Sequence, residues 1–290
     1  MESEAGVSAA STWREVLADA TAALNDGREA RFVCEHAAGL TATEFSGVLD
    51  DAVTERMGLH VQAMVGRRLG GEPLQYVLGR WAFRHLDLLV DRRVLIPRPE
   101  TELLVEAALG FARACAPTRI VVDLGTGSGA VGLSMAHELP LTGTTVWLTD
   151  ASEDALDVAR ANLAGLGRPG ANVRVVRGDW YDALPDSLRG GVDVIVSNPP
   201  YVADGDLEVE LVVRTYEPHD ALFAGPDGLD HLRVIVSGAR AWLRPGGALL
   251  VEIGHRLGDA VLELMRAAGL REAALHRDLA GRDRFAVAFA

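Results

Sequence analysis

Apolar side chains in the first quarter of the chain recur at the spacing of amphipathic helices. They fall into two runs, Trp13, Val16, Leu17, Ala20 and Leu24, then Phe32, Val33, Ala37 and Leu40. From Thr41 to Glu44 the sequence has the pattern of a capping box, in which a hydroxyl and a carboxylate bond free N–H groups at a helix start. The pattern predicts a small helical bundle over residues 11–69.

The helical periodicity stops at Gly70-Gly71-Glu72-Pro73, and shorter apolar stretches follow up to Ile96. Glycine and proline end helices, and closely alternating apolar residues indicate extended chain, so we expect a β-hairpin or a short extended linker. We therefore assign residues 1–75 to an N-terminal helical domain, residues 76–98 to a β-hairpin linker, and residues 99–290 to a second domain.

From about residue 100 onward, apolar strands alternate with amphipathic helices. The expected strands are 120–124, 144–149, 173–177, 192–197, 248–253, a stretch near 273 and 285–289, and the expected helices are 101–114, a stretch up to 139, 152–163, a stretch after 228 and 257–268. Strands this uniformly apolar are buried on both faces, which is typical of a parallel sheet between two layers of helices. The pattern predicts an α/β fold with a doubly wound, Rossmann-like sheet.

Composition excludes several function classes. The chain has 290 residues, a formal net charge of −13 and no lysine, so it lacks the lysine of a P-loop, a Schiff base or a kinase site. Proteins that follow a phosphate backbone usually have a basic face, and neither side of Gln75 has an excess of arginine over acidic residues. We therefore expect no stable nucleic-acid binding, and a protein or small-molecule partner instead.

The cysteine and histidine positions support neither a disulfide nor a metal site. Cys34 and Cys115 lie far apart, and His36, His137 and His255 have no partners at ligand spacing. No apolar run approaches the roughly 18 residues that a membrane-spanning helix needs. Residues 1–16 lack the basic and apolar stretches of a secretion signal. We expect a cytoplasmic protein without a metal or a membrane partner.

A glycine-rich turn, Gly125-Thr126-Gly127-Ser128-Gly129, separates the strand at 120–124 from the next helix. In a doubly wound sheet this turn brings the backbone against a nucleotide, and a Cβ would block that approach. Asp150 ends the following strand, where a carboxylate can accept hydrogen bonds from both ribose hydroxyls of an adenosine. Asp179 and Trp180 follow the third strand and provide a carboxylate and a flat ring where an adenine would lie. Together these residues indicate an adenosine-containing cofactor.

The turn alone does not identify that cofactor. Gly125, Gly127 and Ala130 also satisfy the loose dinucleotide pattern GxGxxG/A, and a glycine-rich turn can simply be a tight connection. A tryptophan such as Trp180 is, by itself, more often an ordinary core residue.

The tetrad Asn198-Pro199-Pro200-Tyr201 follows the strand at 192–197 and therefore faces the ligand crevice of the sheet. Two prolines hold the turn rigid, so the Asn198 side-chain oxygen and the Pro199 carbonyl can both accept hydrogen bonds from one NH2 group. Tyr201 offers a ring on which a planar amide or base can stack. Fixing both N–H bonds directs the nitrogen lone pair at an electrophile. The methyl sulfonium of S-adenosylmethionine is the electrophile that fits both this task and an adenosine site.

Ordered segments over nearly the whole chain resemble the glutamine methyltransferases that modify class I peptide chain release factors. They are GEPLQYVLG (71–79), IPRPETE (96–102), DLGTGSG (123–129), NPPY (198–201), EP (217–218), AL (221–222), LRPGG (243–247) and GRDR (281–284). The resemblance implies a class I S-adenosylmethionine-dependent methyltransferase fold, with a seven-stranded and mostly parallel sheet. It also implies that residues 125–129, Asp150, Asp179 and Trp180 bind the cofactor, with Asn198 near both cofactor and substrate.

The same resemblance implies that the tetrad holds the glutamine of a Gly-Gly-Gln loop and that the N-terminal domain helps to hold the release factor. Asn198, Pro199 and Tyr201 are then the expected catalytic residues. The segment around Arg98 and Glu100 is expected to close over cofactor and peptide, although its acidic residues and proline would also suit a helix start. We expect a monomer.

One departure lies in the hairpin, where relatives commonly carry a glycine after the phenylalanine and this chain has Phe83-Arg84-His85. It places the hairpin turn in question and leaves the expected chemistry unchanged.

Four other functions share part of this pattern. A glutamine methyltransferase for a ribosomal protein would share the tetrad and the glycine turn, and a DNA adenine-N6 methyltransferase uses a similar tetrad but also needs a basic recognition region. A nicotinamide dehydrogenase would explain the glycines without the tetrad. A non-catalytic binding module would usually show a damaged turn or tetrad, and both are intact here.

Overall fold

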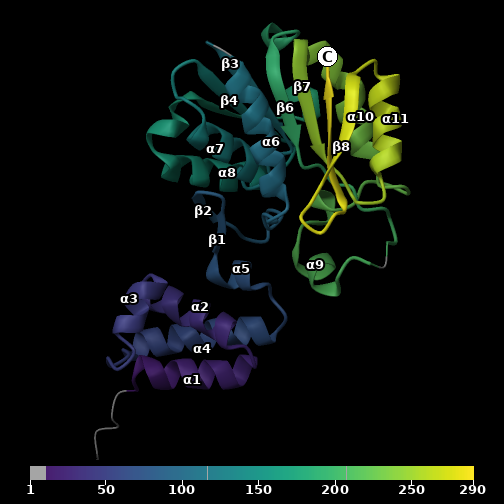
Figure 1. Ribbon diagram of the computed structural model, residues 1–290. Coiled ribbons are helices and arrows are strands. Elements are labelled where there is room, and N and C mark those ends of the chain that lie inside the picture. Colours follow the sequence, from purple (N-terminus) through teal and green to yellow (C-terminus); the bar gives the residue numbers. More distant parts are fainter. Residues whose placement is uncertain (1–10, 116, 207) are drawn as a thin grey trace, which may run out of the picture. The chain divides into compact units, whose positions relative to one another are not determined.

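The computed structural model describes residues 11–115, 117–206 and 208–290. Residues 1–10, which form most of the stretch considered for a secretion signal, lie outside these ranges. The chain divides into two compact units, Met1–Gly79 and Arg80–Ala290 (Figure 1). The boundary follows Gly79, a left-handed glycine with φ 69° that ends the last helix of the first unit.

The first unit consists of helices, as the periodicity predicts for residues 11–69. They are α1 (Trp13–Leu24), α2 (Gly27–Ala38), α3 (Ala42–Gly47), α4 (Glu55–Leu69) and α5 (Leu74–Leu78). The capping box predicted at Thr41 is confirmed, because its hydroxyl accepts from the Glu44 N–H while its own N–H donates to the Glu44 carboxylate. Trp13 and Phe45 meet edge to face in the core, with their ring centroids 5.4 Å apart.

The second unit begins with a hairpin of β1 (Arg80–Phe83) and β2 (Leu86–Leu89), joined by the two-residue turn Arg84-His85. Arg84 has φ 50°, a left-handed conformation that glycine adopts more easily than any other residue. The turn questioned from the sequence therefore forms, with arginine in a conformation that suits glycine.

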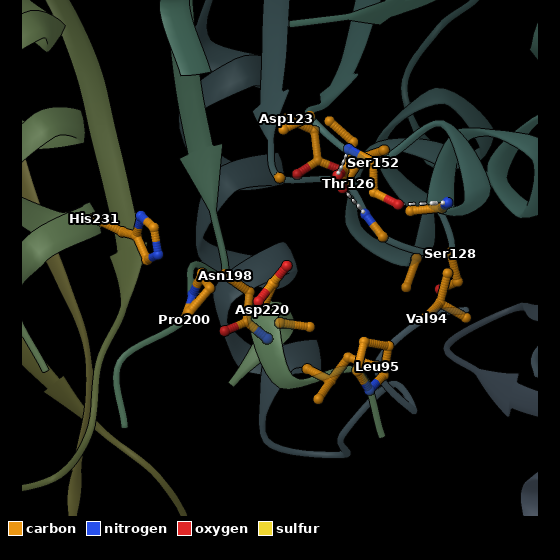
Figure 2. A pocket seen from close by; sticks show the side chains of 18 of the residues that line it. Val94, Leu95, Asp123, Thr126, Ser128, Ser152, Asn198, Pro200, Asp220 and His231 are labelled. Atoms are coloured by element: carbon orange, nitrogen blue, oxygen red, sulfur yellow. Dashed lines mark hydrogen bonds between the residues drawn. The ribbon is translucent and has the colours of Figure 1, made fainter. Parts of the chain in front are cut away.

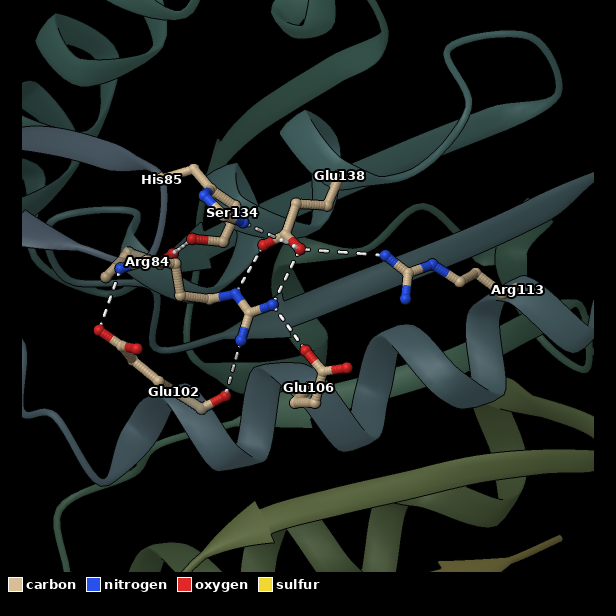
Figure 3. Close-up of polar contacts among 8 residues, drawn as sticks. Arg84, His85, Glu102, Glu106, Arg113, Ser134 and Glu138 are labelled. Carbon is tan, nitrogen blue, oxygen red and sulfur yellow. Dashed lines mark hydrogen bonds and ion pairs between the residues drawn. The ribbon is translucent and has the colours of Figure 1, made fainter.

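The side chain of Arg84 accounts for this conformation, because it anchors the turn to two helices of the same unit (Figure 3). Its guanidinium donates to the Glu138 carboxylate at 2.6 and 2.8 Å, to Glu106 at 2.7 Å and to the Glu102 carbonyl at 3.1 Å. Its backbone N–H donates to the Glu102 carboxylate at 3.0 Å. These charge-assisted hydrogen bonds compensate for the backbone strain.

A seven-stranded sheet forms the centre of the second unit, with strand order β5-β4-β3-β6-β7-β9-β8. The strands are β3 (Arg119–Leu124), β4 (Thr144–Asp150), β5 (Val173–Arg177), β6 (Val192–Ser197), β7 (Leu243–Glu252), β8 (Arg271–Arg277) and β9 (Asp283–Phe289). Strands β3 to β7 pair in parallel, whereas β9 pairs antiparallel with both β7 and β8. The predicted Rossmann-like sheet is thereby confirmed.

Helices pack on the sheet in two groups (Figure 1). In one group, α6 (Thr101–Ala114), α7 (Ala130–Glu138) and α8 (Glu153–Leu166) contact one another in sequence, and in the other α10 (Asp230–Trp242) contacts α11 (Gly258–Ala267). Fully buried strand residues such as Val122, Ile195 and Leu249 form the core beneath α10 and α11. At the carboxyl ends of the parallel strands, the loops that follow the strands therefore form the surface.

The periodicity missed parts of the fold. Helix α5 lies where a hairpin or extended chain was expected, the short helix α9 (Leu211–Tyr216) was not predicted, and β7 begins at Leu243 although the strand was expected only over 248–253. Among the described residues, no helix is long and apolar enough to cross a membrane. Within the same ranges, no group of three or more His, Cys, Asp or Glu side chains is arranged to hold a metal ion.

Candidate active site

A cavity of about 730 Å³ lies at the carboxyl ends of β3, β4, β5 and β6. The turns that follow these strands line it with Gly125, Thr126, Gly127, Ser128, Asp150, Asp179, Trp180, Asn198 and Pro200. Further parts of its wall come from residues 93–95 and 97 and from residues 218–221 and 223. Figure 2 shows Asp123, Thr126 and Ser152 on one side and Asn198 with Pro200 across the cavity. The topology thus brings most of the predicted site residues to one place.

Two carboxylates hold the glycine turn in place, the buried Asp123 and the partly buried Asp150. Asp123 accepts hydrogen bonds from the Thr126 hydroxyl at 2.6 Å and from the Gly132 N–H at 2.8 Å, and burial raises the pKa of Asp123 to about 6. Asp150 accepts from the N–H groups of Gly127 and Ser152, each at 2.9 Å. Burial also raises the pKa of Asp150 above its ordinary range. Each carboxylate oxygen has more than one acceptor site, so Asp150 keeps capacity for ligand hydroxyls.

Glycine is required at the turn for two different reasons. Gly125 has φ 69°, and a Cβ there would lie 3.2 Å from the Trp180 ring, so the backbone and this ring are in close contact. Gly129 does not line the cavity. It precedes α7 with φ 86°, and a Cβ there would lie 2.7 Å from the side chain of Leu133. Gly129 is therefore needed for the backbone conformation at the start of α7.

Trp180 lines the cavity together with Asp179. Its ring also approaches that of His231, with centroids 5.3 Å apart, and its backbone has φ 45°. A non-glycine residue in this conformation is uncommon, and such strain is often found at ligand sites. The ring is therefore placed as a side wall of the cavity and is only partly buried.

The tetrad divides between cavity and core. Asn198 and Pro200 line the cavity, whereas Pro199 and Tyr201 are not among the lining residues. Tyr201 directs its hydroxyl to Glu252, at 3.2 Å from a carboxylate oxygen, and burial raises its pKa well above the ordinary value. The main chain of the turn is packed closely, because a Cβ at Gly228 would lie 2.5 Å from the Tyr201 carbonyl oxygen.

Arg98 and Glu100 lie outside the cavity lining and contact charged residues of the protein itself. Arg98 donates to the Glu217 carboxylate at 2.5 Å, and the Ile96 N–H donates to the other oxygen at 3.1 Å. The Glu217 side chain is 1% exposed. It joins the segment before α6 to the segment after α9, and each segment continues into a wall of the cavity. Glu100 lies 3.8 Å from Arg284.

Sequence reasoning missed Thr101, Glu217 and Glu252. Thr101 lines the cavity, and its hydroxyl donates to the fully buried Glu252 at 2.7 Å. Glu252 ends an apolar strand beside the ligand crevice, and a carboxylate in that position was a usable signal. Glu217 stands in one of the matched segments, but its partners are more than 100 positions away in the chain.

Two family models match the chain. Residues 9–79 match the model described as PrmC N-terminal domain, and residues 100–218 match the model described as Methyltransferase small domain. A protein from Burkholderia pseudomallei named release factor glutamine methyltransferase is 41% identical, over 89% of this chain and 90% of its own length. A protein of the same name from Moorella thermoacetica is 39% identical, over 96% of this chain and 98% of its own length.

Solved structures of methyltransferases share the fold. An SAM-dependent methyltransferase from Agrobacterium tumefaciens gives a TM-score of 0.50 at 19% identity, covering 73% of this chain and 70% of that one. A 16S rRNA N2 methyltransferase from T. Thermophilus, solved with AdoMet and guanosine, gives 0.51 at 19% identity, covering 72% of this chain and 49% of that one. The expected methyltransferase fold is therefore confirmed.

Proposed function

Because the chain belongs to the release factor glutamine methyltransferase family, we propose that it methylates a glutamine side-chain amide of a class I peptide chain release factor. The proposed methyl donor is S-adenosylmethionine, and the proposed target is the glutamine of the Gly-Gly-Gln loop. The observation that carries the proposal is the position of Asn198. Its side chain lines the same cavity as the glycine-rich turn that is typical of adenosine-binding sites (Figure 2).

The residues around the cavity fit the proposed cofactor. The cavity has a volume of about 730 Å³, which is within the range of small-molecule sites. Asp150 would accept hydrogen bonds from the ribose hydroxyls, and the backbone of Gly125 and Gly127 would allow close approach. Asp179 and Trp180 would offer a polar group and a flat ring to an adenine. When bound, S-adenosylmethionine supplies a methyl group on a positively charged sulfur.

Asn198 and Pro199 would hold the substrate nitrogen for the reaction. The side-chain oxygen of Asn198 and the carbonyl oxygen of Pro199 accept hydrogen bonds from the two N–H groups of the substrate amide. These bonds favour a pyramidal nitrogen, whose lone pair can attack. The held nitrogen would take the methyl group that S-adenosylmethionine supplies, with the thioether as the leaving group, and one amide proton would leave to solvent. No strong base is needed before the attack, because the nitrogen lone pair is the nucleophile.

Proposed roles of the other predicted residues follow from their contacts. Tyr201 supports the turn from below through Glu252, and Pro200 forms part of the wall. Arg98 acts through its ion pair with Glu217, which shapes the two segments that close the cavity, and Glu100 acts through its pair with Arg284. The helical unit is proposed to hold the release factor. We propose that the enzyme works as a monomer in the cytoplasm, where termination takes place, with no stable nucleic-acid binding.

Mass spectrometry of a purified release factor tests this proposal. After incubation with the protein and S-adenosylmethionine, we expect one added methyl group on the Gly-Gly-Gln glutamine and none on a substrate in which that glutamine is replaced by alanine. Asn198→Ala should keep the thermal unfolding temperature and lose most of the turnover. No methylation by the wild-type protein, with cofactor binding intact by calorimetry, would contradict the proposed substrate and direct the search to ribosomal proteins.

A further inference from the structure

Glu252 is a buried carboxylate beside the site, and it takes no direct part in the proposed methyl transfer. It ends β7, its residue is 0% exposed, and it reaches toward the cavity wall rather than into the cavity. Its two oxygens accept from the hydroxyls of Thr101 at 2.7 Å and Tyr201 at 3.2 Å. Both partners belong to segments that meet at the cavity.

A second hydrogen bond connects this group to the tetrad. The Asn198 side-chain nitrogen lies 3.4 Å from the Thr101 hydroxyl oxygen and donates to it. Asn198, Thr101 and Glu252 thus form a chain of two hydrogen bonds that starts at the cavity and ends in the core. Residues 101 and 252 are 151 positions apart in the chain.

The direction of these bonds fixes the orientation of an amide. An ionised carboxylate only accepts hydrogen bonds, so the single Thr101 hydroxyl proton is committed to Glu252. The Thr101 oxygen can then only accept, and the Asn198 amide must present its NH2 group to it. The amide oxygen of Asn198 consequently faces away from Thr101. If the amide were reversed, two acceptor oxygens would meet and the NH2 group would face the substrate nitrogen.

We propose that Thr101 and Glu252 are positioning residues that set the orientation of the Asn198 amide, so that its oxygen faces the substrate NH2 group. This inference rests on the proposed function for the identity of that substrate group. Burial raises the pKa of Glu252 to about 7. The hydrogen bonds from Thr101 and Tyr201 and the positive charge of Arg284 favour the ionised form, whereas the negative charge of Glu100 disfavours it. The carboxylate form that commits the Thr101 proton therefore prevails above pH 7.

Kinetics of Thr101 variants at pH 8 provide the first test. Thr101→Val keeps the branched shape and removes both hydrogen bonds, and we expect kcat to fall about 3- to 10-fold, the size of one net hydrogen bond. Thr101→Ser keeps the hydroxyl and should restore kcat to within about 2-fold of wild type. The affinity for S-adenosylmethionine, measured by calorimetry, should change less than kcat, because Thr101 acts on Asn198.

A double-mutant cycle separates positioning from general structural support. In an Asn198→Ala background, Thr101→Val should cause no further loss of kcat, because the group that it orients is gone. An equal loss in both backgrounds, or wild-type kcat in Thr101→Val, would overturn the proposal. Glu252→Gln should also lower kcat, whereas the matched change Asp193→Asn should not. Asp193 is a buried carboxylate at the other end of β6, paired with Arg244.

Selective 15N labelling of asparagine tests the same orientation without any activity. The chain has four asparagines, Asn25, Asn162, Asn172 and Asn198, so four side-chain NH2 pairs are expected. Thr101→Val and Glu252→Gln should both shift the Asn198 pair, whereas Asn162, which donates to the Leu89 and Ser128 carbonyls, should be unchanged. An unchanged Asn198 pair in both variants would overturn the inference even if release factors prove not to be the substrate.

Discussion

Gly228→Ala tests whether the main chain of the tetrad must stay where the structure places it. Gly228 has φ 74°, and a Cβ there would lie 2.5 Å from the Tyr201 carbonyl oxygen and 3.2 Å from its carbon. An ordinary carbon–oxygen contact is about 3.3 Å or longer, so the tetrad backbone must move by about 0.8 Å. A displacement near 1 Å at reacting groups costs on the order of 100-fold in rate, and we expect kcat to fall at least about 10-fold.

Gly190→Ala is the matched control for this variant. Gly190 also has a left-handed backbone, with φ 67°, but a Cβ there meets open space, and it lies before β6 at the end of the strand opposite the tetrad. It should lower the free energy of unfolding by about 1 to 2 kcal/mol through backbone strain alone and leave kcat unchanged. Methyl transfer is followed by mass spectrometry and stability by thermal unfolding. Equal kcat values for the two variants would refute the reasoning.

Three further predictions concern charged side chains. Asp150→Ala should weaken the binding of S-adenosylmethionine about 10-fold or more, because hydrogen bonds to a charged group are lost. The control Asp186→Ala, at an exposed carboxylate, should leave the affinity unchanged. Unchanged affinity of Asp150→Ala by calorimetry would remove Asp150 from the ribose site. The pKa of Glu252 is raised from 4.5 to about 7, so its contribution to stability is full at low pH and is lost as the pH rises through 7, by about 3 kcal/mol. Glu252→Gln should therefore flatten the fall in urea-unfolding free energy between about pH 4.5 and 7, and equal slopes would contradict this prediction. Arg84→Ala should cost about 3 kcal/mol, because it removes the hydrogen-bonded partner of the largely buried Glu138 and leaves only the more distant His85 and Arg113 beside it. Arg84→Gly should cost about 1 kcal/mol less, and the exposed Arg14→Ala should cost less than about 1 kcal/mol by the same assay. Similar losses for Arg84→Ala and Arg14→Ala would show that the Arg84 contacts do not stabilise the turn.

The sequence was sufficient to predict the elements whose pattern is local. Apolar runs such as 192–197 reveal buried strands, and a parallel sheet places whatever follows each strand at one edge. This is why Asp150 and Asn198 could be assigned to a common cavity although they are 48 positions apart. The glycine turn could be predicted for the same reason, because a turn that a ligand approaches closely requires glycine at local positions.

Contacts between distant polar side chains were beyond this reasoning. The link from Thr101 to Glu252 depends on how α6 meets the end of β7, and the link from Arg98 to Glu217 depends on two loops that periodicity does not place. Arg84 shows the same limit for the backbone, since its left-handed conformation rests on partners in α6 and α7. The sequence predicts the position of a side chain along its helix or strand, whereas only the tertiary structure shows which distant side chains pair with each other.

The insertion of β9 between β7 and β8 has a consequence for synthesis on the ribosome. Strand β8 is made before β9 yet neighbours only β9 in the sheet order, so it cannot join the sheet when it first emerges. Until β9 follows, the apolar strand β7 keeps an unpaired edge, and such edges are sites of intermolecular pairing in nascent chains. Truncation within residues 283–289 should therefore yield a chain prone to aggregation, with the five parallel strands paired and the outer edge of β7 left open.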